Sequence, residues 1–110
     1  MSASILLSAN NRWDVPKWIF HQFFDDIRAA YPANKPLCDY LEQIEPILHD
    51  DLNYSPDEAW VARVYNDVAK RIVSGDLVTS CNAETRLIYI SALRTLSELF
   101  EADGRFAAQE

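Results

Sequence analysis

WDVPKWIFHQFFDDIRAAY, residues 13–31, is the stretch whose pattern decides the predicted fold. Asp14 can accept hydrogen bonds from the free N–H groups of a first helical turn, and Pro16 stands where a missing N–H has no consequence. Trp13 and Trp18 have the spacing of a hydrophobic staple across the start of such a helix. The apolar residues that follow recur every three or four positions: Ile19, Phe20, Phe23, Phe24, Ile27 and Ala30. This stripe predicts an amphipathic helix from Asp14 to about Tyr31 with one buried face.

A second helix is predicted after Asn34, which can cap it. Its apolar face carries Leu37, Tyr40, Leu41, Ile44, Ile47 and Leu48. Pro46 lies inside this pattern, and because its ring clashes with the carbonyl one turn back, the helix should kink or break near this residue. A break there would leave His49, Asp50 and Asp51 in a loop.

Two further helices complete the predicted secondary structure. Ser55-Pro56-Asp57-Glu58 has the pattern of a capping box and starts a third helix, which should stop at Gly75. Ser80 or Asn82 can cap a last helix that runs to about Ala102. The inward face of this last helix is predicted to carry Leu87, Ile90, Leu93, Leu96, Leu99 and Phe100.

Size and composition favour one helical domain. A chain of 110 residues can bury a core without a metal or disulfide, and two glycines supply little material for the tight turns of an all-β protein. We therefore predict an all-α, single-domain antiparallel bundle of about four main helices, with the second helix kinked or broken near Pro46. Residues 1–12 are expected to form a partly ordered N-terminal tail.

Residues 36–62 carry the whole excess of negative charge. They contain seven acids and no Lys or Arg, which accounts for the formal net charge of −7. Nucleic acids and anionic membranes repel such a surface, so direct binding to either is not expected. The same charge attracts basic proteins, although it can also do no more than keep a protein in solution.

The sequence offers no complete cofactor or metal motif. Cys38 and Cys81 form no CxxC, and buried free thiols are the plain interpretation. No Glu-x-x-His is present near His49, and the glycines are too few for a phosphate-binding loop. Because there is no basic segment before Ile5 and no long apolar run, we expect a cytoplasmic protein without cofactor or metal.

One pair has the spacing of an acid/base site. His21 and Asp25 lie four residues apart on one helical face, and in a cleft they could exchange a proton with a substrate. More commonly such a pair is a surface hydrogen bond. Nucleophilic catalysis needs a Ser or Cys beside an oriented base, which the sequence does not reveal, and we expect a protein that is not an enzyme.

The acidic segment is instead the candidate for binding a partner. Tyr54 lies between Asp51 and Asp57, and an aromatic ring beside carboxylates suits Lys or Arg. The predicted partner-binding residues are Asp39, Glu42, Glu45, Asp50, Asp51, Tyr54, Asp57 and Glu58. They would dock on a basic protein and mask it.

In size, acidity and lack of catalytic residues the chain resembles bacterial immunity proteins and antitoxins that neutralise nuclease toxins. That likeness implies a basic nuclease toxin as the partner. Two alternatives stay open. One is a small helical enzyme or ligand-binding protein with an inter-helix pocket built from His21, Asp25 or Cys38. The other is a regulatory subunit that forms a homodimer through an exposed apolar stripe.

Overall fold

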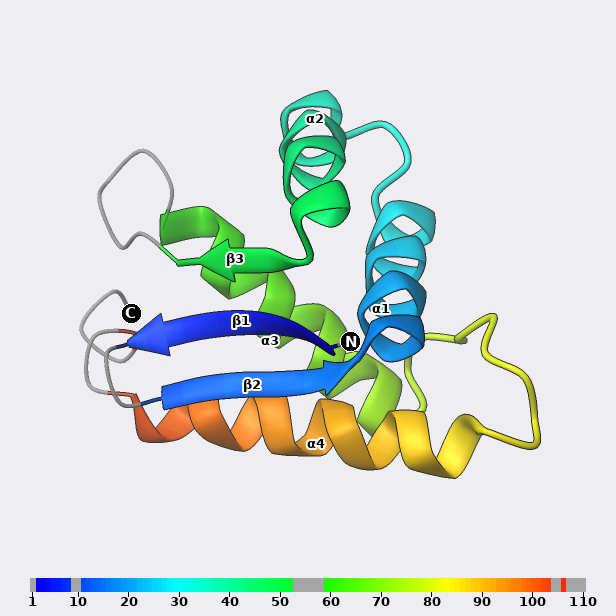
Figure 1. The fold of residues 1–110 in the computed structure, drawn as a ribbon. Helices are drawn as coiled ribbons and strands as arrows, with labels where there is room; N and C mark the ends of the chain where they lie inside the picture. The colour runs from blue at the N-terminus through cyan, green and yellow to red at the C-terminus, as the bar shows by residue number, and fades with distance from the viewer. Residues whose placement is uncertain (1, 9–10, 53–58, 104–105, 107–110) are drawn as a thin grey trace.

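The computed structural model describes residues 2–8, 11–52, 59–103 and 106, and it shows an α+β fold (Figure 1). The strands are β1 (Ser2–Ser8), β2 (Asn11–Pro16) and β3 (His49–Asp51). The helices are α1 (Lys17–Ala30), α2 (Lys35–Ile44), α3 (Ala59–Ser74) and α4 (Arg86–Ala102), with a 3₁₀ turn, η1 (Glu45–Ile47), between α2 and β3. The prediction of an all-α helical bundle is therefore wrong.

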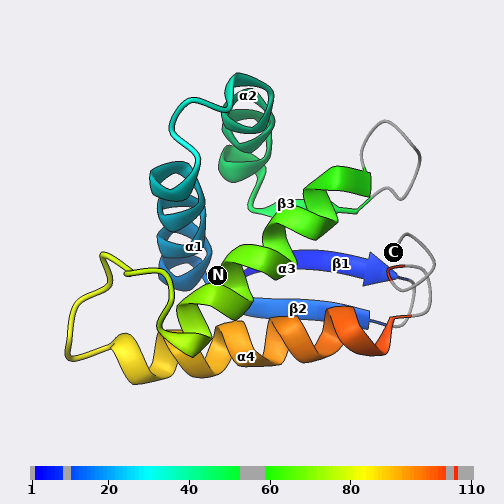
Figure 2. The same cartoon turned by 180° about the vertical axis from the view of Figure 1, so that it is seen from behind.

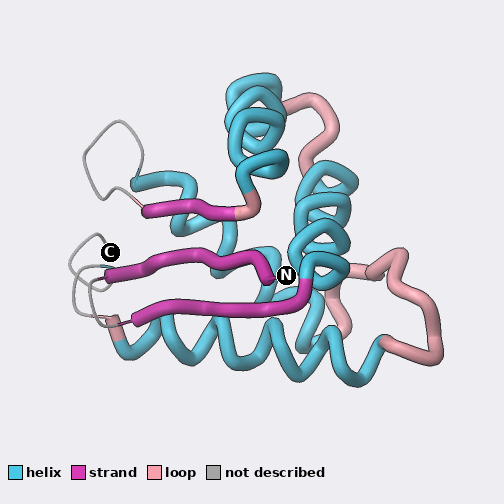
Figure 3. The backbone as a smooth tube through the Cα atoms, viewed as in Figure 1, coloured by secondary structure: helices cyan, strands magenta, loops and turns pink. Residues whose placement is uncertain are grey.

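A three-stranded mixed sheet replaces the expected bundle. The strand order is β2-β1-β3, with β1 antiparallel to β2 and parallel to β3, as the arrows in Figure 1 show, and the three strands are magenta in Figure 3. Ile5 is the central residue of this register, because it pairs with Trp13 on one side and Asp50 on the other. Helices α3 and α4 lie against one face of the sheet, as the view from behind shows (Figure 2).

Residues 1–12, expected as a tail, instead supply the central strand and the start of β2. Ala3, Ile5 and Leu7 are buried on the face that the helices cover. This alternation has the period of two that a half-buried strand requires, but Leu6 beside them makes the segment look like a short apolar cluster. A strand is stable only within a sheet, and neither neighbour of β1 is evident from the local pattern.

The start of the first helix was also wrongly predicted. Asp14 is an exposed residue of β2 between the buried Trp13 and Val15, so it caps no helix. Helix α1 begins at Lys17, after Pro16, without a side-chain capping bond. Because Trp13 belongs to a strand and Trp18 is 39% exposed, the two do not form the predicted staple. The end of the helix, at Ala30 before Pro32, agrees with the prediction.

The second helix was predicted more closely. Asn34 caps α2 by accepting a hydrogen bond from Leu37 N–H at 3.2 Å, and the helix ends at Ile44. Pro46 lies in the 3₁₀ turn that follows, and Leu48 then adopts a left-handed conformation with φ of 62°. The predicted break at Pro46 is confirmed, but the chain continues into β3 and not into a loop.

Helices α3 and α4 pack against each other and complete the core. The capping box predicted at residues 55–58 lies outside the described residues. Gly75 follows α3 with φ of 88°, the left-handed stop that was predicted. Helix α4 ends at Ala102 as expected, and Leu93, Leu96 and Phe100 are buried on its inner face. Leu87 is 81% exposed, which corrects its predicted inward position.

Candidate functional site

The acidic segment forms α2, η1 and β3, and its carboxylates have different surroundings. Asp39 and Glu42 belong to α2, Glu45 to η1, and Asp50 and Asp51 to β3. Tyr54, Asp57 and Glu58, also predicted to bind a partner, lie outside the described residues. The proposed site is therefore not one uniform row of free acids.

Glu45 faces α1 and is neutralised there. His21 Nδ1 donates to Glu45 Oε2 at 2.6 Å, and Arg28 Nη2 donates to Oε1. Partial burial tends to raise the pKa of Glu45, but the hydrogen bonds from His21 and Arg28 outweigh it and hold that pKa below its usual value. Glu45 thus joins η1 to α1, and its charge is already paired within the fold.

Asp50 is an interior residue, 1% exposed. Its carboxylate accepts hydrogen bonds from Tyr40 OH and Tyr65 OH, both at 2.7 Å. Burial, reinforced by the charge of Asp50, raises the pKa of Tyr65 well above its usual value. These bonds tie β3 to α2 and α3, so Asp50 serves the fold and is not on a docking face.

Three of the predicted acids are exposed. Asp39 forms an ion pair with Lys35 one turn earlier, at 3.1 Å. Glu42 and Asp51 make no ion pair or side-chain hydrogen bond within the part of the chain that the structure describes. Between them along the chain stands Ile47, which is 67% exposed. We call Asp39, Glu42, Ile47 and Asp51 the α2–β3 surface.

The rival inter-helix site is not assembled. His21 bonds to Glu45, and Asp25 bonds to Arg28 at 3.1 Å, so the two make separate contacts. Cys38 lies beside the backbone of Tyr31, with its Sγ 3.9 Å from the carbonyl oxygen. In the described ranges, no group of three or more His, Cys, Asp or Glu side chains is placed to hold a metal ion.

The structure brings together a serine and a histidine, the residue types of a nucleophile and a general base, that the sequence did not indicate as a pair. Ser4 Oγ and His49 Nδ1 are hydrogen-bonded at 2.7 Å, across the parallel register of β1 and β3. Ser4 is 5% exposed, and within the described residues no carboxylate is bonded to His49 to orient its ring. The contact links two strands. The two residues are 45 positions apart, so only the sheet register could have revealed them.

A second buried carboxylate was also missed. Asp26, 3% exposed, accepts hydrogen bonds from Tyr89 OH at 2.7 Å, from Thr79 Oγ1, and from Ser80 N–H at 3.2 Å. Burial raises the pKa of Tyr89 strongly, and the hydrogen bond to Asp26 adds to this. The cluster fixes the loop between α3 and α4 against α1. Asp26 lies three residues after Phe23 and seven after Ile19, so helical spacing places it nearer the apolar stripe than Asp25, and this was the signal that could have found it.

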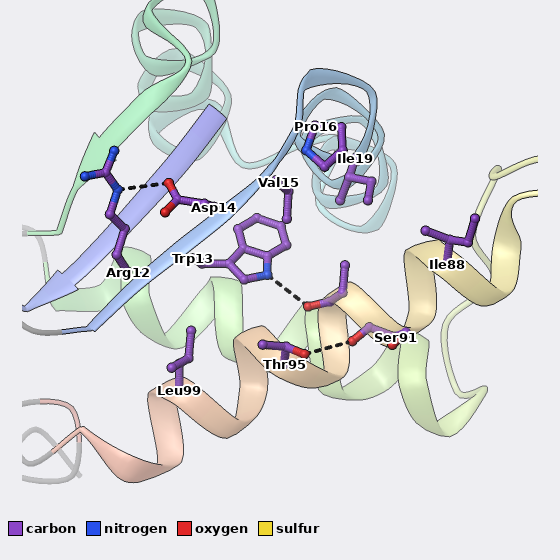
Figure 4. A pocket seen from close by; sticks show the side chains of 11 residues that line it. Arg12, Trp13, Asp14, Val15, Pro16, Ile19, Ile88, Ser91, Thr95 and Leu99 are labelled. Atoms are coloured by element: carbon purple, nitrogen blue, oxygen red, sulfur yellow. Dashed lines mark hydrogen bonds and ion pairs between the residues drawn. The ribbon is translucent and has the colours of Figure 1, made fainter. Parts of the chain in front are cut away.

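A hollow lies between β2 and α4. It has a volume of about 470 Å³, and its walls come from residues 12–16 of β2 and from one side of α4 (Figure 4). Trp13 Nε1 donates to the carbonyl oxygen of Ala92 at 2.9 Å, which holds the helix beneath the strand. Arg12 and Asp14 stand at the rim and pair with each other at 2.9 Å.

Comparison with known proteins gave no match to a family model, a curated protein or a solved structure. Among the described residues, no helix has the length and apolar character needed to cross a membrane.

Proposed function

We propose that this protein is a binding module whose α2–β3 surface docks on a basic surface of another protein and masks it. The observation that carries the proposal is that Glu42 and Asp51, both exposed and without an ion-pair partner in the described part of the chain, lie five positions before and four positions after the exposed Ile47 in the sequence. Carboxylates steer a basic partner into contact, and a desolvated apolar side chain keeps it there. Glu45 and Asp50 of the same segment are bonded inside the fold, so they hold η1 and β3 against α1, α2 and α3.

The partner we propose is a nuclease-type toxin. Proteins that cleave nucleic acids line their phosphate-binding sites with Lys and Arg, and covering such a site blocks the substrate. The net charge of −7 supports this choice because it raises the encounter rate with a basic protein. The function is then that of an immunity protein or antitoxin-like inhibitor, acting by occlusion and without a catalytic step.

Charge-neutralised variants test the docking surface. We would compare the wild type, a triple variant with Asp39→Asn, Glu42→Gln and Asp51→Asn, and a control with Asp76→Asn, Glu84→Gln and Glu98→Gln. Both variants lose the same charge, and the control changes exposed acids outside the α2–β3 surface. Each chain is immobilised, partners are captured from the source organism, and the association rate of the purified partner is measured at low and high salt.

The triple variant should associate about tenfold more slowly at low salt, while the control should stay within about twofold of the wild type. Ile47→Ser should act on the dissociation rate instead, because it removes apolar contact and no charge. For a nuclease partner, cleavage of plasmid DNA should stop at an equimolar amount of the wild type. Equal association rates for the triple variant and its control would refute the proposed surface, and a captured partner without an exposed basic patch would refute the proposed function.

A further inference from the structure

The outer edge of β2 carries backbone groups that face away from the sheet. Ser4 donates its N–H to Leu48 O at 3.0 Å, so Ser4 turns its backbone toward β3. Since these groups alternate in direction along a strand, the next residue, Ile5, turns toward β2, where its register partner is Trp13. Trp13 therefore bonds inward, and the residues on either side of it turn their N–H and C=O groups outward.

Those residues are Arg12 and Asp14. Among the described residues, no turn, loop or side-chain group is hydrogen-bonded to the backbone of either one. Two N–H and two C=O groups at the open edge of the sheet can thus form hydrogen bonds with a further strand. An open edge of this kind is the template on which a further strand can pair.

Helix α4 runs along this edge and forms one wall of the hollow. Ile88, Ala92, Thr95 and Leu99 recur at helical spacing and line the hollow of about 470 Å³ next to β2. Both ribbon views show α4 running along the side of β2 that is away from β1 (Figures 1 and 2). A strand added to β2 would therefore pass over α4, and every second side chain would point into the hollow (Figure 4).

We propose that the groove between β2 and α4 binds an extended segment of a partner protein as a fourth, antiparallel strand, and that this segment reads basic, apolar, acidic. The order follows from the charges at the rim, where Arg12 and Asp14 pair with each other at 2.9 Å and would exchange this exposed pair for two cross-strand pairs. An antiparallel strand places one residue opposite Asp14, the next opposite Trp13 and the next opposite Arg12. A basic residue suits the first position, an apolar residue pointing into the hollow suits the second, and an acidic residue suits the third.

A second copy of this chain fits the groove less well than a single segment. The β2 of another copy also offers the order Arg12, Trp13, Asp14. In an antiparallel pair of whole sheets related by a two-fold axis, however, both α4 helices would lie on the same side and compete for the space beneath the joined strands. An isolated strand brings no helix. This proposal uses β2 and α4 only, and it does not depend on the α2–β3 surface.

Two synthetic peptides of identical composition test the groove. The matched probe is acetyl-Thr-Val-Lys-Val-Glu-Val-Thr-amide, which places Lys opposite Asp14 and Glu opposite Arg12. The control exchanges the Lys and the Glu. Each is titrated into the isotope-labelled full chain, and amide NMR shifts and hydrogen exchange are followed. The matched peptide should slow exchange at the amides of Arg12 and Asp14, and it should bind about tenfold more tightly than the control.

Variants of the protein test whether the peptide binds in the groove or elsewhere on the chain. Arg12→Glu combined with Asp14→Arg should reverse the preference between the two peptides, and both changes are on exposed side chains that leave the core intact. Thr95→Arg should fill the hollow and weaken the matched peptide at least fivefold, whereas Arg94→Ala, on an exposed neighbour that does not line the hollow, should not. Unchanged amides at Arg12 and Asp14, equal affinity for both peptides, or a chain that sediments as a dimer through β2 would overturn the proposal.

Discussion

Replacing Asp26 by alanine should lower the free energy of unfolding by about 3 kcal/mol. Its carboxylate holds Tyr89, whose side chain is buried, together with Thr79 and the backbone of Ser80. Hydrogen bonds to a charged group contribute about 1.5–3 kcal/mol each, and a buried donor left without an acceptor costs a further 1–3 kcal/mol. Removing a buried charge recovers part of this sum, because the carboxylate no longer has to be desolvated. The net loss remains within the total stability of roughly 5–15 kcal/mol for such a domain, so the variant should fold.

A double-mutant cycle identifies the source of that loss. Tyr89→Phe keeps the ring and removes one donor, so it should cost about 1–2 kcal/mol. Because both changes act on the same hydrogen bond, the double variant should be less destabilised than the sum by about 1–2 kcal/mol. The control is Asp25→Ala, the neighbouring acid, which is exposed and pairs with Arg28 alone among the described residues; it should change stability by less than about 0.5 kcal/mol.

The assay is urea unfolding followed by far-UV circular dichroism, with the slope of the transition checked for each variant. An unchanged slope means that the midpoints report stability alone. If Asp26→Ala is no more destabilising than Asp25→Ala, or if the effects of Asp26→Ala and Tyr89→Phe simply add, the carboxylate does not hold the loop.

The other predictions concern pH and backbone conformation. The folded pKa of Glu45 lies below its unfolded value, so its contribution to stability is present above about pH 4.5 and is lost as the pH falls through the folded pKa; Glu45→Gln should flatten stability measured across that acid range. The folded pKa values of Tyr65 and Tyr89 are raised, so stability should fall as the pH rises above about 10, and absorbance near 295 nm should show these tyrosines ionising only as the chain unfolds. Early ionisation of both in the folded chain would contradict their burial. Gly75→Ala meets no atom within 4 Å but forces φ of 88° on an L-residue, so it should cost about 1 kcal/mol in thermal unfolding, more than Ser74→Ala beside it.

Helices could be read from the sequence because their signals are local. The Asn34 cap, the interruption at Pro46 and the stop at Gly75 each depend on a few adjacent residues, and each is found where it was predicted. The position of Leu87 fails for a related reason: spacing defines a stripe along a helix, but not how far the body of the protein extends beneath it. The first turn of α4 therefore exposes a residue that the pattern predicted to be buried.

The sheet could not be predicted because its stability comes from pairing across long separations. β3 is three residues long, and its only described pairing is with β1, some 45 positions earlier in the chain. β3 is too short to show an alternation, and in β1 the apolar Leu6 obscures the alternation of Ala3, Ile5 and Leu7. The register also decides the chemistry, since it buries Asp50 beside Ile5 and brings Ser4 to His49. Asp50 and Asp51 cannot be distinguished from the sequence alone, whereas in a strand the side chains of adjacent residues point to opposite faces of the sheet.

The count of acids therefore overstates the charge that a partner can meet on the α2–β3 surface. Glu45 and Asp50 are engaged inside the fold, and Asp39 is compensated by Lys35, which leaves Glu42 and Asp51 as the free carboxylates among the described acids of residues 36–62. Two exposed charges give speed and orientation to an encounter but little affinity, because water and salt screen them. If this surface binds tightly, the affinity must come from apolar burial, and Ile47 is the described side chain of that surface with area to bury. A dissociation rate that Ile47→Ser leaves unchanged would therefore contradict the argument more directly than any loss of charge.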